Sequence, residues 1–505
     1  MSWGGDSRIA INARTGRNQY GCRLVPEPDV YAFGSSTASS ISERGFEAAE
    51  RMRQRIGLRL ESTEAPTVYA DEVEGVRLRL RQLCSLSADV DIVLAASGTD
   101  AHLIASQVFP NPNSGRPFIV ATGLQESGSG VMAALTGRHF SSRSTYDHAV
   151  PKGELLSGAT DCEVATVPVR HADGSPRDLA EIDNEVEKLV RSQADSGRPV
   201  LLIAIDVSKT GMLAPSVACM QTVQRVYGDN VQVLVDACQF RIGPQTLQTY
   251  LDSQFVVAVT GSKFLVGPSF SAALLVPARV AAQWSRRPVT RALSAYSSQH
   301  DWPSNWVARR DLSEQLNWGL VLRWQAALSG LEAFYQVPTE HAARVIREFA
   351  AALPQAVEPF ARVRMLATPA PARGLFDENE SWDALSTIFP FYLCHTDGHA
   401  VQPLSHKALQ MVHQLLQTDA SNWLPETRDD RIRALASLRC MVGQPVICGT
   451  APSEPLSALR LCLGADQIAW AARQPKSRIA ALLGQVIMIF EKAQLLAAAL
   501  PSSSV

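Results

Sequence analysis

Between residues 90 and 280, short apolar runs rich in β-branched residues alternate with longer amphipathic segments. Apolar runs without polar alternation are typical of strands buried on both faces, and helix-length segments between them are typical of crossover connections. The pattern therefore predicts an α/β fold with a mostly parallel, doubly wound sheet of seven strands. The predicted strands are 91–96, 117–122, 162–169, 200–207, 231–236, 255–260 and 272–276.

After residue 276 the pattern changes to a long helical segment, 312–335, that ends before Pro338. Two strand-like runs, 387–394 and 458–463, then lie among helices, which predicts a smaller α+β domain. A chain of 505 residues is too long for one hydrophobic core. We predict an N-terminal segment of residues 1–70 that contributes to the small domain, a large domain of residues 71–335 and a small C-terminal domain of residues 336–505.

Composition excludes several classes of protein. The chain is 46% hydrophobic and 19% charged, with a formal net charge of −2. The sequence has no stripe of basic residues of the kind that binds a nucleic acid. Residues 1–21 lack the apolar core of a signal peptide, and the apolar stretch 479–500 is interrupted by Glu491 and Lys492, as in a packed helix. Nine scattered cysteines without a C-x-x-C pair argue against a structural metal or a disulfide framework. We expect a cytoplasmic protein without membrane, nucleic-acid or metal partners.

Lys263 is the first candidate for chemistry, because it follows the buried run 255–259 in a short Gly/Ser turn. Apolar surroundings favour the neutral amine, which can attack a carbonyl. Asp236 follows the run 231–235 in the same way, and ligands on parallel sheets bind beyond the carboxyl ends of the strands. A lysine for an aldehyde and a carboxylate for a pyridinium nitrogen together suggest pyridoxal 5′-phosphate (PLP).

Asp236-x-x-Gln239, followed by Thr-Gly-Ser-Lys at 260–263, resembles the class V aminotransferase group of fold-type I PLP enzymes, which includes the cysteine desulfurases. The resemblance covers roughly residues 30–470. It implies that Lys263 forms a Schiff base with the cofactor and later acts as the base at Cα. It also implies that Asp236 keeps the ring nitrogen protonated and that Gln239 donates a hydrogen bond to the phenolic oxygen.

The segment Ser97-Gly98-Thr99-Asp100 follows the run 91–96 and begins a helix, whose free N–H groups favour an anion. The resemblance implies that Gly98, Thr99 and Asp100 hold the cofactor phosphate, with Ser262 as a further ligand. The alternative is a plain helix cap formed by Ser97 or Thr99.

Two segments depart from the family pattern. Glu126 and Ser127 stand where an aromatic residue or histidine usually stacks on the cofactor ring. A small or acidic residue leaves room, or a proton acceptor, on the substrate face, which disfavours ordinary transamination or desulfuration. Ser208 and Lys209 stand where desulfurases carry an asparagine that contacts the cofactor and the substrate carboxylate. Lys209 is either a second cation near the substrate or a lysine that reaches solvent.

Arg460 lies in an apolar run, 459–463, where an unpaired arginine is costly. The resemblance implies that Arg460 binds the α-carboxylate of an amino acid, and the alternative is an edge-strand arginine that points outward. Ser36 and Thr37 either line the substrate side or form a serine-rich turn. Residues 315–319 resemble the segment that reaches a partner subunit's phosphate, with Gln315 in place of a threonine.

These residues favour a PLP-dependent transferase or lyase that acts on an α-amino acid through Lys263, breaking a Cα bond. It would eliminate or replace a side-chain group or transfer the amine, with or without a second co-substrate. We expect a homodimer in specialised biosynthesis. One alternative is a cysteine desulfurase-like lyase with Cys448 as the candidate sulfur acceptor. Others are a PLP-fold binding protein without catalysis and a nicotinamide dehydrogenase that uses the glycine-rich run 128–133.

Overall fold

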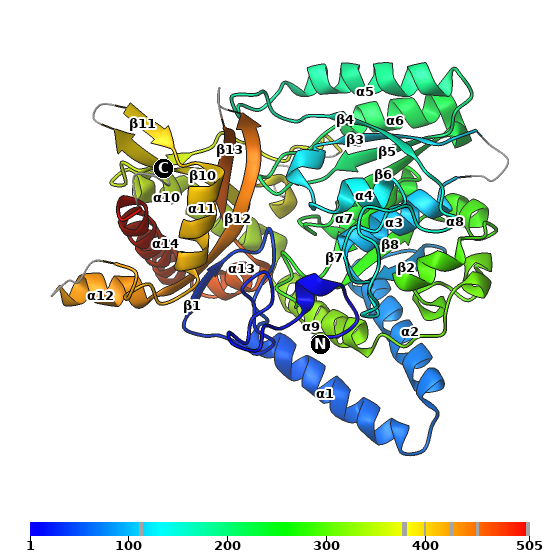
Figure 1. The fold of residues 1–505 in the computed structure, drawn as a ribbon, viewed down its shortest axis with the longest axis horizontal. Coiled ribbons are helices and arrows are strands. Elements are labelled where there is room, and N and C mark those ends of the chain that lie inside the picture. The colour runs from blue at the N-terminus through cyan, green and yellow to red at the C-terminus, as the bar shows by residue number, and fades with distance from the viewer. Residues whose placement is uncertain (111–114, 376–380, 398–399, 425–428, 451–453, 501–505) are drawn as a thin grey trace.

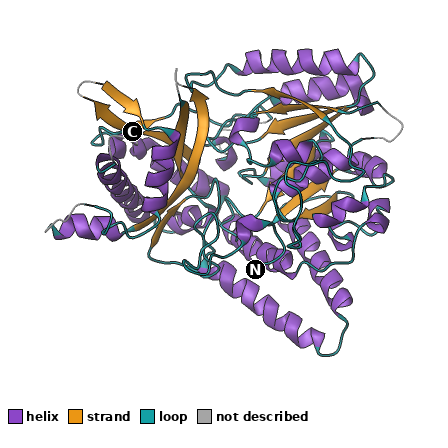
Figure 2. Ribbon diagram, in the orientation of Figure 1, coloured by secondary structure: helices purple, strands orange, loops and turns teal. Residues whose placement is uncertain are grey.

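Two β-sheets organise the chain (Figures 1 and 2). The computed structural model describes residues 1–505 except 111–114, 376–380, 398–399, 425–428, 451–453 and 501–505. The larger sheet has seven strands in the order β2-β8-β7-β6-β5-β3-β4. Its strands are β2 (Asp91–Ala95), β3 (Phe118–Thr122), β4 (Glu163–Val167), β5 (Val200–Ile205), β6 (Val231–Ala237), β7 (Val256–Thr260) and β8 (Ala272–Val276).

Strand β8 runs antiparallel to both of its neighbours, β2 and β7, and the other pairs of the large sheet are parallel. The prediction of a mostly parallel, seven-stranded sheet is confirmed. Successive residues point to opposite faces, so Ile92 and Leu94 join one apolar core while Val93 and Ala95 join another. Both faces are buried, which explains why these strands appear in the sequence as continuous apolar runs.

Helices cover both faces of this sheet. One face is covered by α2 (Ala65–Leu83), α5 (Leu179–Ala194), α6 (Val217–Tyr227), α7 (Pro244–Asp252) and α9 (Trp318–Tyr335). The other face is covered by α3 (Gly98–Val108), α4 (Val131–Leu135) and α8 (Ala278–Trp284). Helix α9 begins later than the predicted 312–335, because the Asn317 side chain caps it by accepting a hydrogen bond from Leu320 N–H.

The second sheet has the order β1-β12-β13-β10-β11, with β9 paired to β10. Its strands are β1 (Val30–Phe33), β9 (Val363–Met365), β10 (Ile388–Asp397), β11 (Ala400–Pro403), β12 (Arg439–Thr450) and β13 (Pro455–Cys462). Strand β1 pairs with β12 in parallel, so a segment near the N-terminus completes a sheet made largely of C-terminal residues.

Helices α10 (Thr339–Val357), α11 (His406–Leu416), α13 (Ala465–Ala472) and α14 (Pro475–Ala498) pack with the second sheet and with one another, at the left of Figure 1. Helices α1 (Glu43–Leu60) and α12 (Asp430–Ser437) pack on α9 and α14, respectively. Among the described residues, α14 is the one helix long and apolar enough to cross a membrane. Its buried Lys492 donates hydrogen bonds to carbonyl groups of Leu416, Thr418 and Leu438.

A buried ion pair lies at the end of β5. Asp206 accepts hydrogen bonds from Arg373 Nε and Nη2 at 2.8 and 2.7 Å, and from the Tyr250 hydroxyl at 2.7 Å. A paired, bidentate carboxylate of this kind is satisfied inside the protein. Asp206 therefore serves the structure, and the residues that follow it are the ones that reach the pocket described below.

Candidate active site

One pocket lies beyond the carboxyl ends of β2, β5, β6 and β7, and the two sheets both contribute to its wall. All of the predicted site residues except Asp100 and Arg460 line it. They are Ser36, Thr37, Gly98, Thr99, Glu126, Ser127, Ser208, Lys209, Asp236, Gln239, Ser262 and Lys263. The fold therefore brings together most of the residues that the sequence pattern indicates as a site.

Lys263 reaches the pocket from the turn after β7. Gly261 is required in this turn, because a Cβ atom there would lie 2.4 Å from Ala327 Cβ on helix α9. The Lys263 side chain is half-buried, and none of the described residues donates to or accepts from its amine. This amine is therefore available to a ligand.

Asp236, at the end of β6, is held by two groups. Cys238 N–H donates to Asp236 Oδ1 at 3.1 Å, and His102 Nε2 lies 3.4 Å from Oδ2. Burial alone would raise the pKa of Asp236, but His102 and Lys263 nearby, together with the Cys238 hydrogen bonds, lower it below its ordinary value. Asp236 is therefore a buried anion at the base of the pocket.

His102 lies beside Asp236 and lines the pocket, and it was not among the predicted site residues. Its Nδ1 lies 2.7 Å from the Gly98 carbonyl oxygen, which can only accept, so Nδ1 carries a proton. The opposite ring nitrogen is thereby turned toward Asp236. The signal for His102 is its place four residues after Gly98, one helical turn beyond the predicted phosphate segment.

Gln239 leaves one polar atom without a partner. Its Nε2 donates to the Ser36 carbonyl oxygen at 3.0 Å, which fixes the orientation of the amide, while Oε1 is buried and makes no hydrogen bond. A buried polar atom without a partner is rare in a folded protein and indicates an absent ligand or water. A donor to the cofactor's phenolic oxygen would have to be the second Nε2 hydrogen.

The predicted phosphate segment forms the first turn of α3. Ser97 caps this helix by accepting from Asp100 N–H, and Thr99 and Ser262 place hydroxyl groups on the pocket wall. Gly98 is needed where it stands, because a Cβ atom would lie 2.8 Å from Cys238 Sγ. The cap and the anion site are compatible, since the cap uses only one of the free N–H groups at this end of the helix.

Asp100 does not face the pocket, contrary to the expected role as a phosphate contact. Its carboxylate is buried and accepts from the hydroxyl groups of Ser97 and Thr145. Burial, with Asp6 nearby, raises the pKa of Asp100 to about 6. An acidic side chain beside a phosphate would repel it, so only the backbone of Asp100 suits that site.

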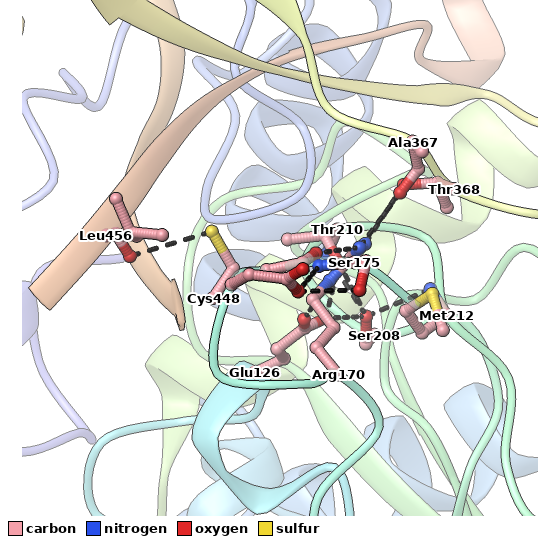
Figure 3. Close-up of polar contacts among 12 residues, drawn as sticks. Glu126, Arg170, Ser175, Ser208, Thr210, Met212, Ala367, Thr368, Cys448 and Leu456 are labelled. Atoms are coloured by element: carbon pink, nitrogen blue, oxygen red, sulfur yellow. Dashed lines mark hydrogen bonds and ion pairs between the residues drawn. The ribbon is translucent and has the colours of Figure 1, made fainter. Parts of the chain in front are cut away.

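Glu126 lies in a closed network of polar groups (Figure 3). Its Oε1 accepts from Arg170 Nε at 2.7 Å, and its Oε2 accepts from the hydroxyl groups of Ser208 and Thr210. Arg170 also donates to the Ala367 carbonyl oxygen at 2.8 Å. Both oxygens of Glu126 are engaged, so this carboxylate anchors the wall and is not poised to accept a proton from a substrate.

Arg460 on β13 is fully buried behind Ser36 and Thr37. Its Nε donates to Ser36 Oγ at 3.1 Å and its Nη2 to Thr37 Oγ1 at 2.6 Å, while Nη1 is buried without a partner. No carboxylate of the described residues forms an ion pair with it. Burial lowers its pKa to about 10. An uncompensated buried guanidinium is costly, so this site fits an anionic ligand.

Lys209 adds a further positive charge to the pocket. Its side chain is half-buried, and its backbone N–H donates to the Glu126 carbonyl oxygen at 3.1 Å. Burial, followed by the charges of Arg460 and Lys263, lowers the pKa of Lys209 to about 7. The pocket therefore gathers more positive than negative charge, which suits a ligand with several anionic groups.

Two alternative sites lack the geometry they require. Cys448 is buried, with its thiol 3.6 Å from the Leu456 carbonyl oxygen (Figure 3) and 3.7 Å from the Tyr392 hydroxyl. Burial raises its pKa to about 11. The glycine-rich run 128–133 does not follow a strand, because a 3₁₀ turn, Leu124–Glu126, separates it from β3. A dinucleotide site needs a glycine-rich turn directly after a strand.

No family model and no curated protein matches this sequence. Solved structures do match it. A NifS-like protein is 14% identical over 92% of this chain and 99% of its own, with a TM-score of 0.53. The cystine C-S lyase C-DES with its product cysteine persulfide is 15% identical over 91% and 97%, with a TM-score of 0.53. This chain has their fold. A C-DES variant with glycine covalently linked to PLP matches with the same TM-score of 0.53 at 15% identity. The resemblance to the class V group is thus confirmed for the fold.

Proposed function

We propose that the chain is a PLP-dependent lyase or transferase that acts on an α-amino acid through Lys263. The observation that supports it best is the meeting of Lys263 and Asp236 in one pocket, from the ends of the adjacent strands β7 and β6. The unpartnered Gln239 Oε1 and Arg460 Nη1 support a polar ligand at this site. When bound, PLP supplies an electron sink for the pair of electrons released when a bond to Cα breaks.

Asp236 would hold a proton on the ring nitrogen of the cofactor. Its lowered pKa keeps it ionised, and a buried carboxylate favours a cationic partner at hydrogen-bond distance. His102, which also lines the pocket, would keep the carboxylate in place through the 3.4 Å contact between Nε2 and Oδ2. The hydroxyl groups of Thr99 and Ser262 would bind the phosphate at the first turn of α3.

Arg460 would bind the α-carboxylate of the substrate. Ser36 and Thr37 already hold two of its donor groups, so the guanidinium is oriented before a substrate arrives. Gly443 lets it lie there, because a Cβ atom at that position would be 2.7 Å from Arg460 Nε. A carboxylate would complete the ion pair that the protein itself leaves open.

Lys263 would move the proton at Cα. Its amine has no partner within the described part of the chain, whereas both oxygens of Glu126 are engaged by Arg170, Ser208 and Thr210. General base catalysis needs a group that is free to reach the proton. Desulfuration through Cys448 is disfavoured, since a thiol with a raised pKa is mostly protonated at neutral pH.

Spectroscopy of the purified protein tests the proposal. PLP should give a visible absorbance band, and borohydride reduction followed by peptide mass spectrometry should place the cofactor on Lys263. Lys263→Ala should lose this attachment, while Lys152→Ala, a change at an exposed lysine, should keep it. A panel of amino acids should then change the band, and product masses would name the reaction. Attachment that survives in Lys263→Ala would overturn the proposal, and a bound cofactor that no amino acid perturbs would favour a binding protein. The homodimer and the cytoplasmic location stay predictions.

A further inference from the structure

A segment near the N-terminus brings an arginine to the predicted phosphate site. Arg8 lines the same pocket as Lys263. Its Nη1 lies 3.5 Å from Thr99 Oγ1 and its Nη2 lies 3.4 Å from Ser97 Oγ, across 91 and 89 residues of sequence. A guanidinium is thus placed beside the hydroxyl groups at the first turn of α3.

The segment that carries Arg8 is anchored by α9. Arg323 is fully buried and donates to the carbonyl oxygens of Trp3 at 2.7 Å and Gly4 at 2.7 Å, and Asn317 Nδ2 donates to the Gly4 carbonyl oxygen at 3.0 Å. Gly4 has φ +82°, and a Cβ atom there would lie 1.7 Å from Asn317 Oδ1. Only glycine fits this close approach. The chain therefore fixes the path of this segment toward the pocket.

The Arg8 guanidinium is oriented before any ligand binds. Asp6 accepts from Nε at 2.9 Å and from Nη2 at 2.6 Å, and the Phe270 ring centroid lies 4.9 Å from Arg8 Cζ. Burial alone would lower the pKa of Arg8, but Tyr20 and Asp6 raise it above its ordinary value, so it stays charged. Asp6 engages Nε and Nη2, whereas Nη1 makes only the 3.5 Å contact with Thr99 Oγ1, so Nη1 has a hydrogen for a second anion.

A neighbouring hydroxyl group independently indicates a ligand. Ser269 is 8% exposed, lines the same pocket and makes no hydrogen bond through Oγ. It directly precedes Phe270, the ring on which Arg8 lies. Buried hydroxyl groups ordinarily have partners, so an acceptor is missing here.

We propose that Arg8 binds the phosphate group of PLP, so that this chain completes its own phosphate site from its N-terminal segment. The inference rests on the proposed function. The expected contact of residues 315–319 with a partner subunit's phosphate stays a prediction, and within this chain Asn317 caps α9 and holds Gly4. Asn317 would influence the phosphate site indirectly, by holding the segment that carries Arg8 in position. A phosphate group fits this place, because the Nη atoms of Arg8 lie beside the Ser97 and Thr99 hydroxyl groups at the first turn of α3.

Comparison of PLP with pyridoxal, which lacks the phosphate, tests this inference. Arg8→Met keeps an unbranched apolar stem and removes the guanidinium, and Arg14→Met is a matched control at an exposed arginine of the same segment. Dissociation constants for both ligands come from absorbance titration of the apo protein. We expect Arg8→Met to weaken PLP binding by roughly tenfold to a hundredfold, the usual effect of losing a hydrogen-bonded charge, and to leave pyridoxal binding nearly unchanged. Arg8→Lys should recover part of the loss.

A second readout uses no cofactor. Inorganic phosphate should raise the melting temperature of the wild-type apo protein and of Arg14→Met, and raise that of Arg8→Met less. An unchanged ratio of PLP to pyridoxal affinity in Arg8→Met would overturn the assignment, as would an equal loss of both ligands. Failure of the wild type to bind PLP at all would instead reject the proposed function, and the inference with it.

Discussion

Replacing Glu126 by glutamine tests whether this residue anchors the pocket wall or handles protons. The side chains of Glu126 and Arg170 are 1% and 3% exposed, and they pair at 2.7 Å. Glutamine keeps the shape of the side chain and removes its charge, which leaves the Arg170 guanidinium buried with a weaker partner. Breaking a buried ion pair costs about 3–5 kcal/mol, and the amide oxygen can still accept one hydrogen bond. We therefore expect the free energy of unfolding to fall by about 3 kcal/mol.

Urea unfolding of the apo protein, followed by circular dichroism, measures this loss. Glu163→Gln is the matched control, because Glu163 pairs with Arg198 at 2.9 Å but is 49% exposed, and such surface pairs contribute less than about 1 kcal/mol. The double variant Glu126→Gln with Arg170→Met should recover part of the stability, because it removes both charges and leaves no unpaired buried guanidinium at this position. If Glu126→Gln costs no more than Glu163→Gln while turnover collapses, Glu126 is a catalytic acid or base and the anchoring role is refuted.

Three further changes probe the charges and the cysteine. Between pH 7 and 10.5 the unfolded chain binds more protons at Lys209 than the folded protein does, because the pKa of Lys209 is lowered on folding. Lys209→Met should therefore stabilise the apo protein by about 1–3 kcal/mol at pH 7 and by less toward pH 10.5, as measured by thermal unfolding at several pH values. No gain in stability at pH 7 would contradict the lowered pKa. Gly443→Ala should displace the Arg460 guanidinium and raise the KM for the amino acid by about tenfold or more, with kcat less affected. An unchanged KM would show that Arg460 does not bind the carboxylate. Cys448→Ala should cost about 1 kcal/mol in thermal unfolding and keep activity. A variant that folds but has no turnover would assign the thiol a role.

The strands of the large sheet and the pair Lys263 and Asp236 were predictable, because both depend on signals within a few residues of sequence. Strand β12 was missed, since Gly443 and Pro445 interrupt it and its pairing with β13 shifts register between Gly443 and Val446. Partners joined only by the fold were also missed. Arg170 meets Glu126 across 44 residues, and no local pattern reports that contact.

The sequence also could not show which charges are already satisfied. Glu126 looked free to accept a proton until its three partners were known, and Asp100 looked like a phosphate contact until Thr145 was found beside it. Arg8 gave no motif, because its role depends on a segment that Arg323 holds in place. Local sequence identifies a candidate group, and only tertiary contacts decide whether it is available.

The parallel pairing of β1 with β12 determines when the second sheet of the nascent chain can be completed. Val30 pairs with Arg439, so β1 cannot pair with β12 until most of the polypeptide has been synthesised. Ser36 and Thr37 follow that strand and meet Arg460 only after it is seated. The end of the pocket at which we propose that the substrate binds is therefore assembled late, when translation is nearly finished. A prematurely terminated chain would carry Lys263 without Arg460.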